Sequence, residues 1–194
     1  MRFMETGIAG AWVIDPTPHQ DDRGQFQRAW CAKEFAEHEV DFVPVQANMA
    51  FGIARGTIRG MHMQDATAIE AKLVRCTRGV VFDVVIDLRP ESPTYGEWYG
   101  VELSAENGRM LYVPGCCAHG CQTLEKQTEI HYMASAFFTP GAVRGFRYND
   151  PVFAVQWPLA ATAVSDQDRN WPLVDRLELS LTRRIFVGDN QFLE

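Results

Sequence analysis

The sequence predicts an all-β fold, an antiparallel β-sandwich or jelly roll, from three observations. Glycine and proline, 15 and 10 in number, punctuate the whole chain. The segments between them are short and rich in Val, Ile, Phe, Tyr and Trp, which favour strands over helices. The turn signals recur at the spacing typical of sandwiches and barrels.

Nine segments are expected to form strands: residues 11–14, 25–30, 42–48, 72–76, 79–88, 97–104, 109–113, 118–124 and 128–136. Pro90 to Pro93 and Glu106 to Gly108 supply turn residues between them. Residues 32–39 and about 174–184 are expected to form short peripheral helices. Because no linker, repeat or low-complexity stretch interrupts the chain, residues 1–194 are expected to form a single domain.

The composition narrows the class of protein. With 46% hydrophobic and 22% charged residues, the chain is globular rather than disordered. Its net charge of −7 disfavours a nucleic-acid binder, which would normally be basic. No apolar run approaches the roughly 18 residues of a membrane span, and the start lacks a signal-peptide pattern. We therefore expect a cytoplasmic protein that contacts neither a membrane nor nucleic acid.

The basic residues and the cysteines are both unevenly used. Only three of the 18 basic residues are lysines. Arginine suits a local anion site, although a GC-rich genome would also favour it. The five cysteines are odd in number and form no CxxC pair, so they are expected to be small buried residues rather than disulfides.

The first stretch that could carry chemistry runs from Arg59 to Gln64. Alternation along a strand would place Arg59 and Met61 on one face and Gly60, His62 and Gln64 on the other. Such a histidine is often structural.

A functional role for this histidine is favoured by a nearby lysine. Lys72 is one of only three lysines and shares a strand face with Val74.

Two groups of residues resemble the two cupin motifs: Gly60, His62, Gln64 and Glu70, then Gly108, Pro114 and His119. Metal-binding cupins use an HxH pair, a Glu and a later His. Here Gln64 replaces the second histidine, which suits a metal less well. A metal-dependent cupin such as an oxygenase, with His62, Glu70 and His119 as ligands, remains an alternative.

A third stretch, Glu129 to Tyr132, places Ile130 and Tyr132 on one strand face. A tyrosine with its ordinary pKa near 10 can donate a proton at neutral pH. The alternative is a tyrosine that packs across strands.

Signposts along about residues 7–172 resemble those of the dTDP-4-dehydrorhamnose 3,5-epimerase family. They are Asp22-Arg-Gly24 with Phe26, Gln46-x-Asn48, Ile58 to His62, Lys72 to Arg75, Val84 to Arg89, Ser92 to Gly96, Leu103 to Asn107, Pro114 to Gly120, Asn149 to Pro151, Trp157-Pro158 and Ser165-x-x-Asp168. Each alone is weak, but their order over this length makes the resemblance strong. It implies a cupin-type jelly roll, or double-stranded β-helix, that epimerises a nucleotide-diphosphate 4-keto-6-deoxy sugar.

The resemblance also implies roles for four catalytic residues. His62 would remove a proton beside the ketone, Asp168 would pair with His62, and Lys72 would stabilise the enolate. Tyr132 would return a proton from the opposite face. The chemistry needs these parts, because the developing oxyanion must meet a donor, and inversion requires a base and an acid on opposite faces.

The resemblance further implies a binding set and a homodimer. The residues expected to bind sugar, diphosphate or base are Arg23, Phe26, Arg28, Gln46, Asn48, Arg59, His119 and Phe138, with Phe138 stacking on the base. Residues near 23–28 would reach the partner's site. Neither a metal nor a cofactor is expected.

Departures from the family concern recognition rather than chemistry. The family usually has Glu at Arg28, Glu at Val143, Lys at Gln167 and Tyr at Phe138. A CDP-linked substrate and epimerisation at C3 or C5 alone are therefore alternatives. A catalytically silent binding cupin is a further one, which the intact catalytic set disfavours.

Overall fold

The computed structural model describes residues 1–174. Within them the elements are β1 (Arg2–Glu5), β2 (Trp12–Asp15), β3 (His19–Asp21), β4 (Gly24–Phe26), α1 (Ala32–Glu37), β5 (Gln46–Gly52), β6 (Thr57–Gln64), β7 (Lys72–Arg78), β8 (Val80–Asp87), β9 (Trp98–Ser104), β10 (Met110–Val113), β11 (Cys117–Thr123), β12 (Thr128–Ala134), β13 (Val143–Gly145), β14 (Ala163–Val164) and α2 (Asp166–Asn170).

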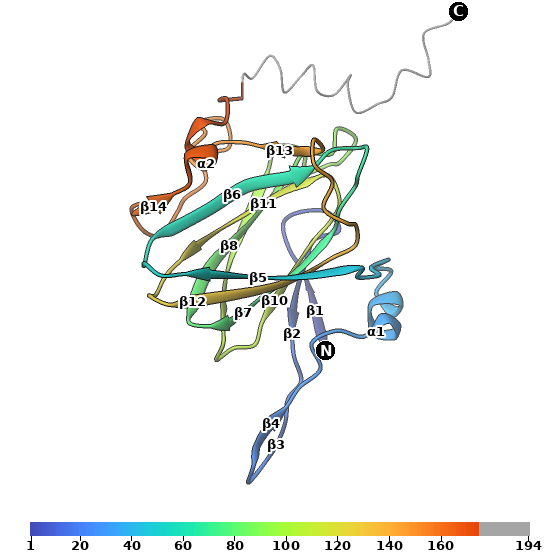
Figure 1. Cartoon of the computed structure of the whole chain (residues 1–194). Helices are drawn as coiled ribbons and strands as arrows, with labels where there is room; N and C mark the ends of the chain where they lie inside the picture. The colour runs from blue at the N-terminus through green and yellow to red at the C-terminus, as the bar shows by residue number, and fades with distance from the viewer. Residues whose placement is uncertain (175–194) are drawn as a thin grey trace, which may run out of the picture.

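Most strands belong to two facing sheets (Figure 1). The first has the order β1-β2-β10-β7-β12-β5, and the second has the order β13-β6-β11-β8-β9, with β14 added beside β6. Every pairing is antiparallel except the short parallel one between β14 and β6. The expected all-β jelly roll of the cupin type is confirmed.

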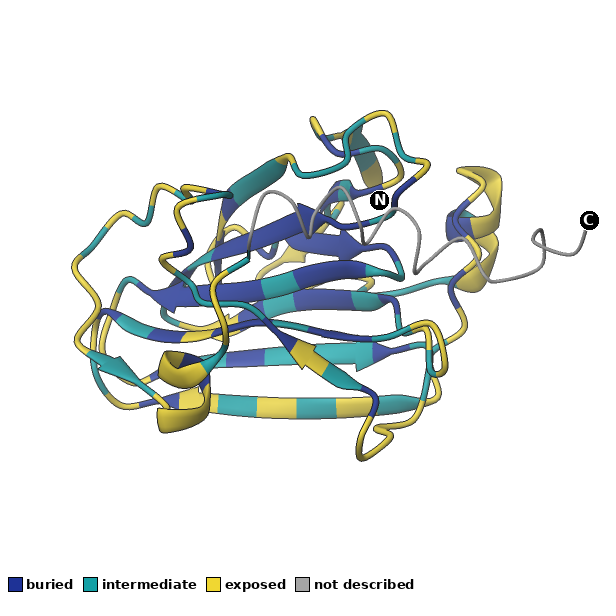
Figure 2. Cartoon of the chain, turned by 90° about the horizontal axis from the view of Figure 1, so that it is seen from above, coloured by how far each residue is buried: buried dark blue, intermediate teal, exposed yellow. Residues whose placement is uncertain are grey.

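The central core fills the space between the sheets. Val74 and Leu111 of the first sheet and Val85 and Leu103 of the second are fully buried there. The edge strand β5 alternates between half-buried and exposed positions, whereas β10 and β11 are buried at nearly every position, and Figure 2 shows both patterns. Side chains from both sheets therefore pack together in one central core.

Two further clusters cover the outer faces of the sheets. Phe35 of α1 and Phe42 pack with Tyr112 outside the first sheet. Met61 and Phe153 belong to a cluster outside the second sheet. The cover on the first sheet explains one error of prediction: Phe42 belongs to this cluster, so the strand expected over 42–48 is instead β5, residues 46–52.

The remaining strand predictions were largely correct. The runs 72–76, 79–88, 97–104, 109–113, 118–124 and 128–136 correspond to β7–β12. The strand expected over 25–30 was too long, because β4 ends at Phe26. The helix expected over 32–39 is α1, whereas the one expected over about 174–184 falls, beyond Val174, outside the described residues.

The β3–β4 hairpin stands away from the body of the molecule (Figure 1). Its six strand residues are all exposed. None of the three hydrophobic clusters formed within residues 1–174 includes a residue of this hairpin.

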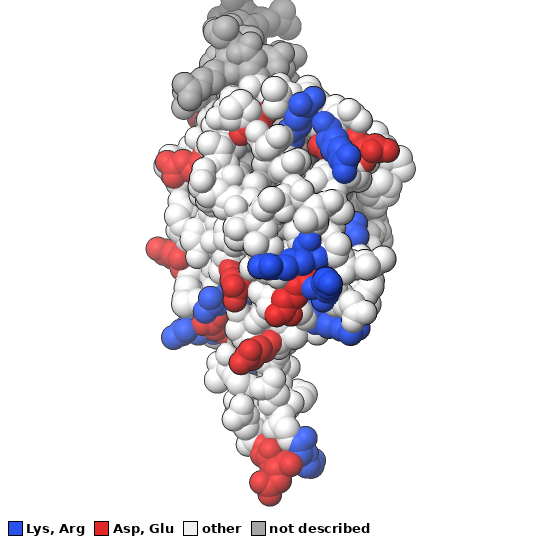
Figure 3. Space-filling model, turned by 90° about the vertical axis from the view of Figure 1, so that its left-hand side faces the viewer, with Lys and Arg blue, Asp and Glu red and all other residues white. Residues whose placement is uncertain are grey.

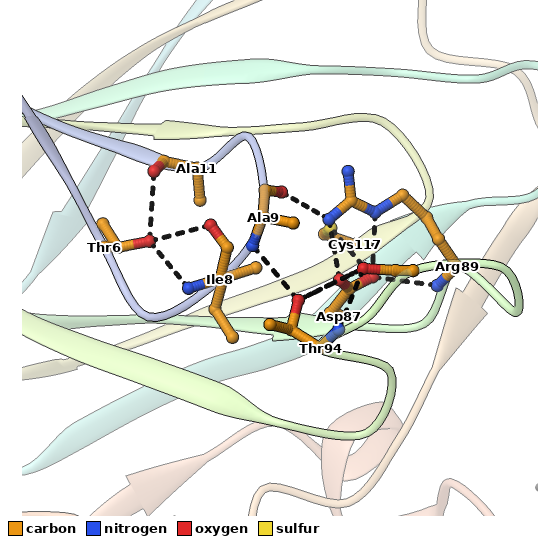
Figure 4. Close-up of polar contacts among 9 residues, drawn as sticks. Thr6, Ile8, Ala9, Ala11, Asp87, Arg89, Thr94 and Cys117 are labelled. Carbon is orange, nitrogen blue, oxygen red and sulfur yellow. Dashed lines mark hydrogen bonds and ion pairs between the residues drawn. The ribbon is translucent and has the colours of Figure 1, made fainter.

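A buried carboxylate joins the N-terminal loop to the end of β8 (Figure 4). Asp87 accepts hydrogen bonds from Arg89, Ser92 and Thr94. Arg89 in turn donates to the carbonyl of Ala9, and the Ala9 N–H donates to Thr94. This network links residues about 80 positions apart in the chain. It thereby holds the N-terminal loop against the end of β8, at the end of the sandwich remote from the β3–β4 hairpin.

In the described part of the chain all five cysteines are free, three of them buried and two half-buried. No helix within residues 1–174 is long and apolar enough to cross a membrane.

Candidate active site

A pocket of about 600 Å³ opens between the two sheets. The first sheet contributes side chains of β5, β7 and β12, and the second contributes side chains of β6 and β11. Segment 163–168, which comprises β14 and the start of α2, forms a further wall. The lining residues are Ala50, Thr57, Ile58, Arg59, His62, Lys72, His119, Cys121, Ile130, Tyr132, Ala163, Val164, Ser165, Gln167 and Asp168.

A bulge in β6 decides which side chains enter this pocket. His119 pairs with His62 and Cys121 with Arg59, so three steps along β6 match two steps along β11. A bulge of this kind breaks the alternation of faces. Arg59 and His62 therefore both line the pocket, whereas Met61 is buried outside the second sheet. The predicted sharing of one face by Arg59 and Met61 was wrong for this reason.

His62 is paired with a buried carboxylate. Its Nε2 lies 2.5 Å from Oδ1 of Asp168, whose Oδ2 accepts the Gly60 N–H at 3.2 Å. Burial alone would raise the pKa of Asp168, but the hydrogen bond from His62 and the others it receives lower it below 3.8. Because an ionised carboxylate only accepts, the proton lies on Nε2, which leaves the lone pair of neutral His62 on Nδ1.

The short helix α2 positions this carboxylate. Ser165 is its N-cap, and the hydroxyl oxygen of Ser165 accepts the N–H of Asp168 at 3.0 Å. Asp168 is the buried residue of the helix and turns toward β6. The predicted pairing of His62 with Asp168, 106 residues apart in sequence, is present.

Lys72 and Tyr132 enter the pocket from the first sheet. Lys72 Nζ lies 3.4 Å from Glu70, and both side chains are nearly buried. Tyr132 pairs with Val74 across β7 and with Asn48 across β5. Burial, and secondarily the charge of Glu70, raise the pKa of Tyr132 above 10, so the phenol is protonated at neutral pH.

His119 has its own buried partner, which the sequence reading missed. Its Nε2 lies 2.9 Å and 3.1 Å from the two oxygens of Asp83, which is fully buried. The available signal was an aspartate inside an otherwise apolar strand, since a buried carboxylate requires a partner. Arg59, beside it in the pocket, donates to the carbonyl of Phe51.

Gln46, Asn48 and Phe138 form a second group near Tyr132. Gln46 donates to Asn48 at 3.1 Å and accepts the N–H of Phe138 at 3.3 Å. Gln64, fully engaged as both donor and acceptor, holds the backbone of Phe137 and Thr139 on either side. The ring of Phe138 is thereby presented to solvent on an anchored loop.

Three predicted binding residues lie away from the pocket of their own chain. Arg23 and Phe26 are on the exposed β3–β4 hairpin, and Arg23 pairs there with Asp21. Arg28 forms an ion pair with Glu34 of α1 at 2.6 Å. The structure of one chain therefore does not bring these residues together with His62.

The charge of the site is local. Arg59 and Lys72 bring positive charge to the pocket and Asp168 brings negative charge, and the face shown in Figure 3 also has basic and acidic side chains interspersed. His62, His119 and Glu70 are engaged with Asp168, Asp83 and Lys72 respectively. Across residues 1–174 no group of three or more His, Cys, Asp or Glu side chains could hold a metal ion.

A histidine paired with a carboxylate, a protonated tyrosine and a lysine around one cavity can move protons to and from carbon beside a carbonyl. The fold and the pocket together define an acid–base site in a protein of the cupin type.

Comparison with known proteins gives the family. The model of dTDP-4-dehydrorhamnose 3,5-epimerase matches residues 5–176, so the chain belongs to this family. It is 40% identical over 181 residues to the dTDP-4-dehydrorhamnose 3,5-epimerase of Sinorhizobium fredii, covering 93% of each chain. It is also 36% identical to a dTDP-4-dehydrorhamnose 3-epimerase of Streptomyces niveus, covering 88% of this chain and 82% of that one.

A solved structure gives the same result. The dTDP-6-deoxy-D-glucose-3,5-epimerase of Legionella pneumophila, in complex with dTDP-4-keto-L-rhamnose, superposes with a TM-score of 0.84 at 33% identity. The match covers 92% of this chain and 96% of that one.

Proposed function

We propose that the protein epimerises a dTDP-linked 4-keto-6-deoxyhexose at carbons that flank the C4 ketone, as a step of deoxysugar biosynthesis. One observation carries the proposal: His62, Lys72 and Tyr132 line a single pocket, and His62 is paired with the buried Asp168. The nucleotide and the sugar are inferred from the substrates for which the relatives are named.

His62 acts as the base through Nδ1. Loss of the substrate proton to this nitrogen makes an imidazolium, which the Asp168 carboxylate on Nε2 stabilises. The electron pair moves onto the carbonyl oxygen, and the ammonium of Lys72 meets the negative charge there. The hydrogen bond and ion-pair partners of both side chains keep them oriented before the substrate arrives.

Tyr132 supplies the proton to the opposite face of the sugar. His62 belongs to β6 of the second sheet and Tyr132 to β12 of the first, so base and acid approach the cavity from opposing walls. Protonation from the side opposite to abstraction inverts the carbon. Arg59 and His119 bind the diphosphate and the sugar. Gln46, Asn48 and Phe138 form the end of the site that holds the nucleobase.

The experiment is incubation with dTDP-4-keto-6-deoxyglucose in D2O, followed by NMR. Deuterium at C3 and C5 with inversion at both would support a 3,5-epimerase, and exchange at C3 alone would identify a 3-epimerase like the Streptomyces niveus relative. His62→Asn should abolish exchange. An active His62→Asn variant, or activity that depends on an added metal, would overturn the proposal.

We also propose that the protein is a homodimer in which each β3–β4 hairpin completes the partner's pocket. Three features support this: the hairpin is exposed on all its strand residues, it projects from the body, and it holds Arg23 and Phe26. A second copy would also cover the exposed apolar side chains of the edge strand β5 and the residue after it, Met49, Phe51 and Ile53. Two-fold symmetry is the commonest closed arrangement of soluble oligomers.

Mixed dimers test this arrangement. Alone, the His62→Asn variant should be inactive and the Phe26→Ala variant weakly active. After the subunits exchange, a hybrid dimer has one pocket with an intact His62 and an intact partner Phe26, so roughly a quarter of the sites should recover. Light scattering should give a dimer mass. A monomer, or no recovery on mixing, would contradict the proposal.

A further inference from the structure

Trp171 contacts the wall of the pocket behind His62. It directly follows α2, and its indole lies against Gly145 of β13, which is paired with His62. A Cβ atom built on Gly145 would lie 2.0 Å from Cε2 of the indole and 2.2 Å from Nε1. The rings of His62 and Trp171 are 6.4 Å apart at 65°, an edge-to-face arrangement.

The backbone at Trp171 is also held. Arg147 donates from Nε to the Trp171 carbonyl at 2.7 Å, and the Val174 N–H donates to Asp150 at 2.7 Å. Arg147 is two residues after Gly145, so side chain and main chain of Trp171 are fixed to the same segment. This segment, β13 and the residues after it, also forms backbone hydrogen bonds with β6 at Met61.

The helix that holds Asp168 has only five residues and needs such a fixed point. A helix this short is not stable alone and takes its position from tertiary contacts. Its first end is fixed by β14, which pairs with β6. Its other end is fixed by Trp171, three residues after the carboxylate that meets His62.

We infer that Trp171 is a positioning residue: its packing on Gly145 sets the distance and angle between Asp168 and His62. This inference rests on the proposed function, in which His62 is the base. The Trp171 Nε1 is buried and has no hydrogen-bond partner among residues 1–174. The indole therefore acts by its apolar ring, and a phenylalanine should replace it in part.

Gly145 allows a test from the other side of the contact. Its φ is not in the left-handed region, so alanine brings no backbone strain, only a collision with the indole. Gly100 is the matched control, because its Cβ would lie 2.2 Å from Cζ of Phe82 in β8, which does not line the pocket. Gly145→Ala and Gly100→Ala therefore impose the same kind of overlap near the site and far from it.

The experiment measures kcat, KM and thermal stability for Trp171→Ala, Trp171→Phe, Gly145→Ala, Gly100→Ala and the double variant Gly145→Ala/Trp171→Ala. Since small misplacements of catalytic groups can cost about 100-fold, we expect Trp171→Ala to lower kcat about 10- to 100-fold with KM within about twofold. Trp171→Phe should recover most of the loss. The double variant should be no slower than Trp171→Ala, because the collision is gone.

Several results would overturn the inference while the wild type remains active. They are an unchanged kcat in Trp171→Ala, an equal fall of kcat in Gly100→Ala, and multiplying losses in the double variant. If Trp171→Ala does not fold, an unchanged kcat in folded Gly145→Ala overturns it instead. An inactive wild type would be the failure of the proposed function, and the inference would fall with it.

Discussion

Replacing Asp168 with asparagine should inactivate the base by moving its proton to the wrong nitrogen. In the native pair, Oδ2 of Asp168 accepts the Gly60 N–H and Oδ1 faces Nε2 of His62. In Asp168→Asn the amide oxygen is needed by Gly60, so the NH2 group faces His62. Nε2 must then accept, and the proton moves to Nδ1, the atom that should hold the lone pair.

The geometry also sets the size of the effect. The active tautomer requires the amide to flip, which leaves the Gly60 N–H facing an NH2 group. An unmade buried hydrogen bond costs about 1–3 kcal/mol, so the active form is reduced roughly 5- to 150-fold. The variant also lacks the charge that stabilises the imidazolium. Together these should lower kcat by about 10²–10⁴, the range for loss of a general base.

The assay is deuterium exchange into the substrate beside direct measurement of kcat. Asp166→Asn is the control, because the same substitution is made two residues away at an exposed position of the same helix. It should leave kcat unchanged. Retention of kcat within about threefold in Asp168→Asn, with the fold intact by circular dichroism, would refute the assigned tautomer and the role of the pair.

Three further predictions follow from other parts of the structure. Tyr132→Phe should retain deuterium exchange but lose net inversion, because His62 still forms the enolate; parallel loss of both would show that Tyr132 acts earlier. Burial would raise the pKa of Asp87, but the hydrogen bonds from Arg89 and its neighbours lower it to about 2. The resulting stability is present above the unfolded pKa of 3.8, so about 2 kcal/mol of unfolding free energy should be lost as pH falls from about 5 to about 2. Because other carboxylates such as Asp15 and Asp168 also have lowered pKa values, urea titrations should show an acid loss that is smaller by this amount in Asp87→Asn than in the wild type. Finally, calorimetry should show that the wild type, with Arg28, discriminates weakly between dTDP and CDP. The Arg28→Glu variant should favour dTDP more strongly. A strong preference for dTDP that Arg28→Glu leaves unchanged would contradict this prediction.

The strands from β7 to β12 were predictable because their signals are local. Residues 79–88 are apolar apart from the two aspartates, and turn residues bound them, so they needed no distant partner to be recognised as a buried strand. Lys72 and Tyr132 both line the pocket, as alternation predicts, because the pairing of β7 with β12 is regular from Lys72 to Cys76 and its register shift lies beyond, at Glu129. The resemblance supplied the pairing of His62 with Asp168, which no local pattern could predict.

The parts that were missed depend on contacts between distant segments. The bulge that brings Arg59 beside His62 exists because β6 pairs with β11, about 60 residues later in the chain. The alternation of side chains within β6 alone cannot predict an irregularity that depends on the partner strand. Asp83 and Trp171 became part of the site only when the fold brought them to His119 and Gly145. Strand identity follows from short-range sterics and burial, which the order of side chains determines. The register between strands and the atoms that face one another depend on how the two sheets close, which only the tertiary structure decides.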